Sequence, residues 1–502
     1  MAYQRALYVV LLAARILFAV SPAYIHPDEY FQAPEVSASD IFGIDALRTW
    51  EFTGEAPVRS IIPIYLFSGT PQIIVRLIQY MLVLAGWQLE LTPWLLFYAN
   101  RVFMALLSYT IDICVVRAIR QQYPNTRLNA TRFVLATSFC LAVFHTHTFA
   151  NSFASVILAV CFDFLSTIEC SARKHKSPKS LNRTCLLLGV ALALGTFTHV
   201  SFPMFALPVA LIAGLLLIRS AFYSGLLAIA AGGTLTSLAL VVADSVYYGS
   251  IQLRLADGTL KITGSPTCTV LNNVLYNSNH DNLTIHGIHA WYNHMVISVP
   301  TLFGPLAILA LAKGWTFIKS ARMRRNTSYV SVAAALSAIS GLAFLSLVPH
   351  QEPRFLIPML PAIVICTWRW HWIAPAYFWH LWIAFNSVLS VLYGVVHQAG
   401  VIPAVVFISQ TSVSPSVECR TLLHGDAVCV RVQAAHNATT SVRTKVLLFA
   451  SYMAPRHLLA QPTNQGIVSG ILASYQLRPT SSALCRPVPR TLSCRCIATR
   501  PT

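Results

Sequence analysis

Long apolar runs, each close to the length of a membrane crossing, dominate the pattern of the chain. About 20 apolar residues cross a bilayer as a helix, and shorter polar segments separate the runs. We predict spans at residues 6–22, 94–117, 133–149, 152–169, 184–198, 202–218, 222–243, 295–317, 328–348, 354–370 and 374–396. The pattern therefore predicts an all-α polytopic membrane protein with about 11 transmembrane helices.

One further apolar run, residues 61–85, is predicted not to cross the membrane. Pro63, Pro71 and Arg76 make it a poor spanning segment. The number of crossings between the basic loops also requires that both ends of this run lie on the same side of the membrane. We predict an interfacial or re-entrant helix here, with an ordinary span as the alternative.

Clusters of basic residues predict which loops face the cytosol, because short loops rich in Lys and Arg stay on that side. The clusters lie at residues 117–132, 173–183 and 313–325. Counting crossings from them places loops 23–93 and 244–294 on the far, lumenal side. We therefore divide the chain into a transmembrane domain over residues 1–397 and a lumenal C-terminal tail over residues 398–502.

The composition agrees with a membrane protein and narrows the function. Of the 502 residues 56% are hydrophobic and 10% are charged, whereas a soluble protein has about a quarter charged. The net charge of +18 does not indicate nucleic-acid binding, because the basic residues sit in the loop clusters. The chain has no Walker phosphate loop, which argues against an ATP-driven pump.

Cysteines and glycosylation sequons predict a lumenal, oxidising environment for the tail. Asn282 and Asn437 are the Asn-x-Ser/Thr sites that this topology places in the lumen, so both are expected to be glycosylated. Several cysteines in the last hundred residues indicate disulfide formation, with the pairing left open. They are Cys419, Cys429, Cys485, Cys494 and Cys496.

Polar residues gather on the lumenal side of the predicted topology. Ionisable groups are expensive at a membrane boundary, so several on one face predict a site that handles charge. The alternative is that loop ends are simply polar. The residues at span ends are His26, Asp28, Glu29, Asn151, His199, Asp244, His350, Glu352, Arg354 and His397, and those in the two long loops are Glu51, Arg59, His286, His289 and His294.

The adjacent carboxylates Asp28 and Glu29 are the strongest candidates for chemistry. A carboxylate accepts a proton from an attacking hydroxyl, and a partly buried position raises its pKa toward a useful value. Adjacent side chains diverge, so one is expected to act and the other to support it. Pro27 restrains the backbone beside them. The alternative is that Asp28 is only a helix N-cap.

The segment from His350 to Arg354 has the composition of an anion site. Arg354 can fork onto a phosphate, and Glu352 can orient Arg354 or His350. The alternative is a plain Glu352–Arg354 ion pair. The histidines at 286, 289 and 294 lack a carboxylate or cysteine among them, and the chain has no DxD motif, so we predict no metal.

Several motifs together resemble the family 22 glycosyltransferases, multi-span mannosyltransferases of the GT-C class. The first lumenal loop carries the motifs His26-Pro27-Asp28-Glu29-Tyr30-Phe31-Gln32, Thr49-Trp50-Glu51-Phe52 and Arg59-Ser60. A second signature is His350-Gln351-Glu352-Pro353-Arg354. The Gln-Glu-Pro form resembles a branch that acts on glycosylphosphatidylinositol (GPI) precursors, and the resemblance runs from about residue 20 to about residue 460.

The resemblance implies a reaction and its partners. The donor is dolichyl-phosphate mannose, the acceptor is the third mannose of a lipid-linked GPI glycan, and the product bond is α-1,2. The displacement inverts the sugar in one step, with Asp28 as base, Glu29 in support and Arg354, His350 and Arg59 on the phosphate. The resemblance also implies a multi-pass protein of the endoplasmic reticulum membrane with a lumenal site and no cofactor.

Departures from the family pattern bear on the acceptor. His147 and Ala154 stand where relatives have Arg and Glu, and His199 stands where they tend to have Arg. The alternatives are a sister mannosyltransferase, which adds the third GPI mannose or extends the dolichol-linked N-glycan, and a lipid flippase or transporter.

Overall fold

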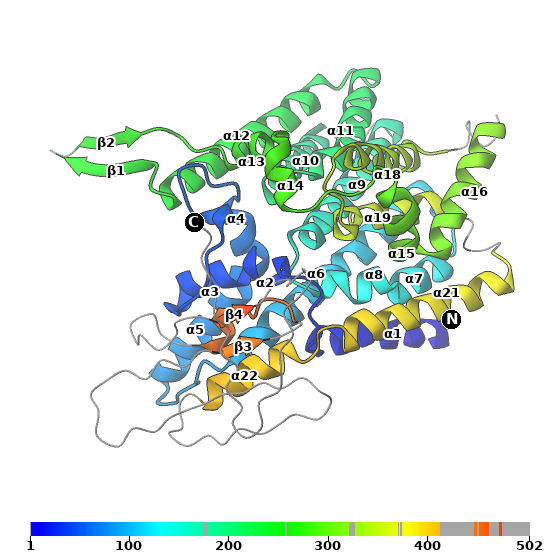
Figure 1. Cartoon of the computed structure of the whole chain (residues 1–502). Coiled ribbons are helices and arrows are strands. Elements are labelled where there is room, and N and C mark those ends of the chain that lie inside the picture. Colours follow the sequence, from blue (N-terminus) through cyan, green and yellow to red (C-terminus); the bar gives the residue numbers. More distant parts are fainter. Residues whose placement is uncertain are drawn as a thin grey trace, which may run out of the picture.

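The computed structural model describes residues 2–174, 178–256, 259–320, 327–369, 371, 374–411, 446–448, 451–460 and 471–473, and within these ranges it is mostly helical. Figure 1 shows the long helices packed side by side into one body. The longer helices are α1 (Ala2–Val20), α5 (Thr70–Leu84), α6 (Pro93–Gln122), α9 (Ala150–Lys174), α10 (Pro178–Thr198), α11 (Phe202–Arg219), α12 (Tyr223–Tyr247), α16 (Pro305–Lys319), α18 (Tyr329–Leu347), α21 (Ala376–Val391) and α22 (Val401–Thr411).

Short helices and turns join the long ones and build the loops. The short α-helices are α2 (Asp28–Phe31), α3 (Pro34–Phe42), α4 (Ile61–Ile64), α7 (Asn129–Thr137), α8 (Phe139–Ala142), α13 (Thr269–Ser278), α14 (His280–Ile285), α15 (Val299–Phe303) and α19 (Met359–Thr367). The 3₁₀ and π turns are η1 (Trp50–Phe52), η2 (Tyr65–Gly69), η3 (Phe144–Thr146), η4 (His294–Ser298), η5 (Pro353–Leu356), η6 (Leu392–Val396) and η7 (Arg456–Leu459).

The helix lengths confirm a multi-pass membrane protein. Among the described residues 8 helices are long and apolar enough to cross a membrane, or 9 if the bent pair His294–Phe303 and Pro305–Thr316 forms one span. That pair bends by 116°. Gly304 sits at the bend with φ +47°, and a side chain there would collide with the ring of Phe385.

The segment predicted to be an interfacial or re-entrant helix is a continuous helix. Ile61–Leu84 is 24 residues long and, by length and composition, qualifies to cross a membrane. Pro63 lies in the first turn, where its missing N–H costs nothing. The π turn η2 comes just before Pro71 and accommodates the second proline. The two prolines therefore do not interrupt the helix, and by length and composition the segment also fits the alternative of an ordinary span.

Two predicted spans, 133–149 and 354–370, are broken into short helices in the protein interior. In the first, buried side chains compete for backbone groups: Asn386 accepts a hydrogen bond from Phe139 N at 2.7 Å, and His145 contacts Cys140 O at 2.9 Å. In the second, α19 has nine residues, all buried. Irregular backbone is tolerated at membrane depth when protein surrounds it. Neither run forms a single helix long enough to count as a candidate span by length and composition.

Close helix packing and one buried ion pair hold the body together. A side chain on Gly189 of α10 would meet Ile229 O of α12 at 2.1 Å, so only glycine permits this approach. Arg15 of α1 forms two hydrogen bonds to Asp112 of α6, at 2.6 and 3.0 Å, and both residues are buried. This ion pair fixes the first helix against the centre of the fold.

The structure also contains short strands, which the sequence pattern did not predict. β1 (Ile251–Ala256) and β2 (Thr259–Gly264) pair antiparallel, with Ile251 opposite Gly264, and the hairpin projects from the body in Figure 1. β3 (Val446–Leu448) and β4 (Ile471–Ala473) pair in parallel.

The described part of the tail packs against the first loop. Ile402 of α22 and Leu458 of η7 join a buried cluster with Tyr30 and Phe31 of α2. Glu35 accepts hydrogen bonds from the backbone N and the ring Nδ1 of His457, both at 3.1 Å. The turn that carries Asp28 therefore rests partly on the tail. The tail cysteines and Asn437 lie outside the described residues.

Candidate active site

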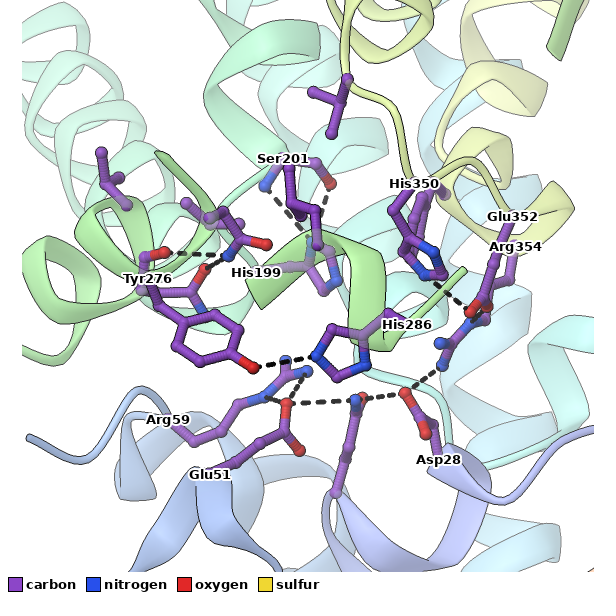
Figure 2. Close-up of a pocket in the computed structure, with 18 of the residues that line it drawn as sticks. Asp28, Glu51, Arg59, His199, Ser201, Tyr276, His286, His350, Glu352 and Arg354 are labelled. Carbon is purple, nitrogen blue, oxygen red and sulfur yellow. Dashed lines mark hydrogen bonds and ion pairs between the residues drawn. The ribbon is translucent and has the colours of Figure 1, made fainter. Parts of the chain in front are cut away.

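A cavity of about 560 Å³ opens where the first long loop, the α13–α14 segment and the α18–α19 connection meet. Figure 2 shows side chains from all three segments pointing into this space. Its predicted lining residues are His26, Asp28, Glu51, Arg59, His199, His286, His350, Glu352 and Arg354. Residues more than 300 positions apart in the sequence thus share one pocket.

The short helix α2 delivers Asp28 to the cavity. Pro27, with φ −51°, starts the turn, and Asp28 N donates to Nδ1 of His26 at 3.2 Å. The Asp28 carboxylate accepts a hydrogen bond from Arg354 Nη1 at 2.5 Å. The N-cap position of α2 is Pro27, and Asp28 is the first residue of the helix. Its carboxylate is therefore directed at charged partners rather than at its own helix.

The segment 350–354 arranges its charges around Arg354. Glu352 accepts from Arg354 Nε and, at 3.0 Å, pairs with Nε2 of His350. The other ring nitrogen of His350 contacts Gly287 O at 3.0 Å, which orients the ring. Arg354 therefore lies between two carboxylates, Glu352 and Asp28, in Figure 2. The predicted Glu352–Arg354 ion pair is present, and it faces the cavity.

A chain of polar contacts crosses the cavity floor. Arg59 donates to Glu51 Oε1 through Nε at 2.9 Å and through Nη2 at 2.7 Å. Gln32 donates to the same Glu51 oxygen at 3.4 Å and also to Asp28 Oδ2. Gln32 therefore connects the Arg59–Glu51 pair to the Asp28–Arg354 pair. The sequence analysis did not predict this contact. The spacing of four residues between Asp28 and Gln32, which places both on one face of a helical turn, could have indicated it.

Charge pairing sets the protonation of these carboxylates. Burial favours the neutral acid of Asp28, but the Arg354 guanidinium and His26 outweigh it, so the pKa of Asp28 lies well below its usual range. Burial likewise opposes ionisation of Glu352, and Arg354 and His350 again lower its pKa. Burial also favours the neutral guanidine of Arg354, but the two carboxylates raise its pKa. The site is thus a compact set of ionised groups.

Glu29 points away from the cavity. Its carboxylate is fully buried and lies 2.7 Å from Arg101 Nη2 and 3.9 Å from His147 Nε2. Burial raises the pKa of Glu29 to about 7, against the opposing charge of Arg101. The two adjacent carboxylates therefore have different surroundings, and Glu29 supports the turn from behind.

Several other predicted site residues do not line the cavity. Asp244 is buried and accepts from Ser60 Oγ at 3.0 Å and Ile61 N at 2.9 Å, which ties α12 to the first loop. Asn151 is buried in α9. His289 lies behind His350, with ring centroids 5.9 Å apart. His397 contacts the hydroxyl of Tyr452 at 3.4 Å. Direct substrate contact by these four is not indicated.

The structure adds two lining residues to which the sequence analysis assigned no role. Trp50 and Tyr276 stack with ring centroids 4.2 Å apart, and the Tyr276 hydroxyl lies 3.0 Å from Nε2 of His286.

His199, which was predicted to belong to the site, lines the cavity as well. Burial together with Arg59 and Arg354 lowers its pKa to about 3. The His199 ring is therefore neutral near pH 7.

Among the residues that the structure describes, no group of three or more His, Cys, Asp or Glu side chains is arranged to hold a metal ion. The cavity carboxylates are occupied by arginine and histidine partners.

The family follows from comparison with known proteins. The model of the Alg9-like mannosyltransferase family matches residues 6–442 of this chain. The chain belongs to the Alg9-like mannosyltransferase family. The resemblance to family 22 that the motifs predicted is thereby confirmed, and the protein is a glycosyltransferase.

Relatives within the Alg9-like family share most of the chain. GPI mannosyltransferase 4 of Aspergillus oryzae is 31% identical over 84% of this chain and 74% of that protein. GPI mannosyltransferase 4 of Emericella nidulans is 33% identical over 79% of this chain and 68% of that protein. The crystal structure of ArnT from Cupriavidus metallidurans bound to undecaprenyl phosphate has a TM-score of 0.51, with 13% identity over 82% of this chain and 66% of that chain. That likeness confirms the GT-C fold.

Proposed function

We propose that the protein transfers mannose from dolichyl-phosphate mannose to the third mannose of a lipid-linked GPI precursor, through an α-1,2 bond. The observation that carries the proposal is the meeting of Asp28 with Arg354 and His350 at one cavity. A carboxylate beside an arginine and a histidine suits a reaction in which a hydroxyl loses a proton while a phosphate leaves. The names of the relatives support the GPI acceptor.

The reaction is a single inverting displacement. The acceptor hydroxyl attacks C1 of the β-linked mannose, its proton passes to Asp28, and the bond from C1 to the phosphate oxygen breaks. The electron pair of that bond leaves with dolichyl phosphate. An α-linked product results without a covalent sugar intermediate.

Arg354 has a second role in this scheme. In the structure its guanidinium pairs with Asp28, which makes Asp28 a weak base. The donor phosphate competes for the same guanidinium, because arginine binds phosphate through two parallel hydrogen bonds. Donor binding therefore weakens the Asp28–Arg354 pair and raises the basicity of Asp28 in the loaded site. His350 and Arg59 add positive charge on either side.

The proposal includes an endoplasmic reticulum location with the cavity on the lumenal face. Asn282 lies in α14, beside the cavity-lining Leu283, and its amide donates to Tyr276 O at 3.0 Å. If the cavity faces the lumen, Asn282 should carry a glycan. An endoglycosidase should remove this glycan, and the Asn282→Gln variant should lack it. Cytosolic exposure of this loop in a protease-protection assay would contradict the orientation.

Microsomes that contain the wild-type chain and labelled dolichyl-phosphate mannose test the proposal. We expect label on a GPI acceptor with three mannoses and none on an acceptor with two mannoses or on a dolichol-linked N-glycan. Transfer to either of the latter instead would assign the protein to a sister reaction. Absence of transfer to all three would contradict the proposed function.

A further inference from the structure

The cavity has two chemically different halves. One half carries the ionised groups around Asp28 and Arg354. The other half is lined by Trp50, Tyr276 and the amide-bearing Asn273 and Asn277, and formal charge is sparse there. Glu51 and Gln32 join the halves through the floor contacts described above. A ligand that fits both halves has a charged end and a neutral polar body.

The second half presents a firm aromatic surface. Trp50 and Tyr276 stack with an interplanar angle of 26°, and Trp50 keeps 44% of its surface exposed. Side-chain amides fix the two elements to each other, because Asn272 donates to Pro57 O at 2.9 Å and Asn273 to Val58 O at 3.2 Å. The platform is therefore held in place before a ligand arrives, which reduces the entropic cost of binding.

An aromatic face beside amides and a carboxylate matches the surface of a neutral sugar. A sugar ring offers C–H groups that pack on an aromatic face, and its hydroxyls need hydrogen-bond partners at the edge. Glu51 follows Trp50 directly in the chain, and Gln32 links Glu51 to Asp28. A sugar on Trp50 therefore lies along the row of polar groups that leads to the proposed base.

We propose that Trp50 and Tyr276 form an acceptor-sugar platform, which stacks a neutral hexose ring of the acceptor glycan and directs its terminal hydroxyl toward Asp28. The platform rests on the proposed function for the identity of the glycan. In this arrangement the donor phosphate binds in the charged half of the cavity, and the acceptor sugar binds in the aromatic half.

Kinetics of transfer separate the two halves. Trp50→Ala is expected to raise the acceptor KM about tenfold, which corresponds to about 1.4 kcal/mol, with the donor KM unchanged. Trp50→Phe keeps a ring and is expected to recover most of the loss. Trp291→Ala is the matched control, because Trp291 is 71% exposed in a neighbouring loop and does not line the cavity. It should behave as the wild type.

A water-soluble trimannosyl glycan without lipid distinguishes a sugar platform from a membrane anchor. Its binding to the purified protein, measured by saturation-transfer NMR, is expected to weaken about tenfold in Trp50→Ala and to stay unchanged in Trp291→Ala. Equal glycan binding by Trp50→Ala and the wild type would overturn the platform and leave Trp50 as an interfacial anchor. Trp50-dependent glycan binding without any mannose transfer would support the platform and contradict the proposed function.

Discussion

Asp28 and Glu29 are neighbours in the chain, yet each belongs to a different charged region. Asp28 pairs with Arg354 at the wall of the cavity, where 25% of its side chain is exposed. Glu29 pairs with Arg101 in a closed pocket, where neither side chain is more than 1% exposed. A ligand in the cavity can therefore compete with Asp28 for Arg354. The Glu29–Arg101 pair is enclosed by protein and has no such access.

One short motif supplies both the proposed reacting carboxylate and the buried ion pair that positions it. Arg101 also donates to Ala23 O at 2.6 Å, so the buried pair holds the chain on both sides of His26 and Asp28. A buried ion pair adds little net stability, but removing one partner leaves an uncompensated charge. Glu29 is therefore a positioning residue, and Asp28 is the proposed reacting group.

The largest expected effect is the loss of the proposed base. Asp28→Asn keeps the size of the side chain but cannot accept the proton, so kcat should fall about 10²- to 10⁴-fold. The thermal unfolding temperature should change little, because the Asp28 pair is partly open. Asp281→Asn, a surface change in α14, serves as the control. A large loss of stability in Asp28→Asn would contradict the assignment of a structural role to Glu29 alone.

The next largest effect concerns the phosphate end of the cavity. Arg354→Lys keeps the charge but loses the two-pronged guanidinium, so the donor KM should rise about tenfold while the acceptor KM stays constant. Arg76→Lys, on the exposed side of α5, should be neutral in the same assay. If Arg354→Lys alters the acceptor KM alone, Arg354 does not hold the donor phosphate.

A smaller effect is expected from the protonation of His350. Glu352 raises its pKa above the ordinary 6.5, although burial acts in the opposite direction. The protonated ring attracts phosphate, so donor affinity should fall about threefold as the pH rises through this pKa. His350→Gln should flatten that dependence, whereas His280→Gln in an exposed position should not. The donor KM measured from pH 6 to 9 checks this, and an identical profile in His350→Gln would remove His350 from the donor site.

The smallest effect is a pH dependence of stability that comes from Glu29. Its folded pKa of about 7 exceeds its ordinary value of 4.5. Such a group stabilises the fold below the unfolded value and loses that contribution as the pH rises through the folded value. Wild-type unfolding temperatures should therefore decline between about pH 4.5 and 7, and Glu29→Gln should reduce the decline. Glu55→Gln, on the surface, should leave it intact. An unchanged slope in Glu29→Gln would show that Glu29 does not titrate in the folded protein.

The sequence predicted the fold class and many of the residues around the cavity. Ionisable residues at span ends are few in an apolar chain, so the topology alone brought Asp28, His350 and Arg354 to one side. The pattern did not predict where an apolar run is divided into short helices. Residues 133–149 and 354–370 are as apolar as the other predicted crossings, yet the structure divides the described part of each into short helices.

Contacts that depend on the geometry of the loops could not be predicted from the sequence. The stacking of Trp50 on Tyr276 requires two loops more than 200 residues apart to be joined through Asn272 and Asn273. The surroundings of Asp244 depend on loop geometry too. One of its carboxylate oxygens accepts from Ser60 and Ile61 in the first loop, and the other accepts from Thr269 of α13.

Asp28 is the proposed base of a mannose transfer to a GPI precursor. The most direct test is mannose transfer from dolichyl-phosphate mannose to a GPI precursor with three mannoses, in membranes that contain equal amounts of wild type or Asp28→Asn. We predict transfer by the wild type and a loss of at least about 100-fold in the variant. Near-normal transfer by Asp28→Asn, or no transfer by the wild type, would contradict the account.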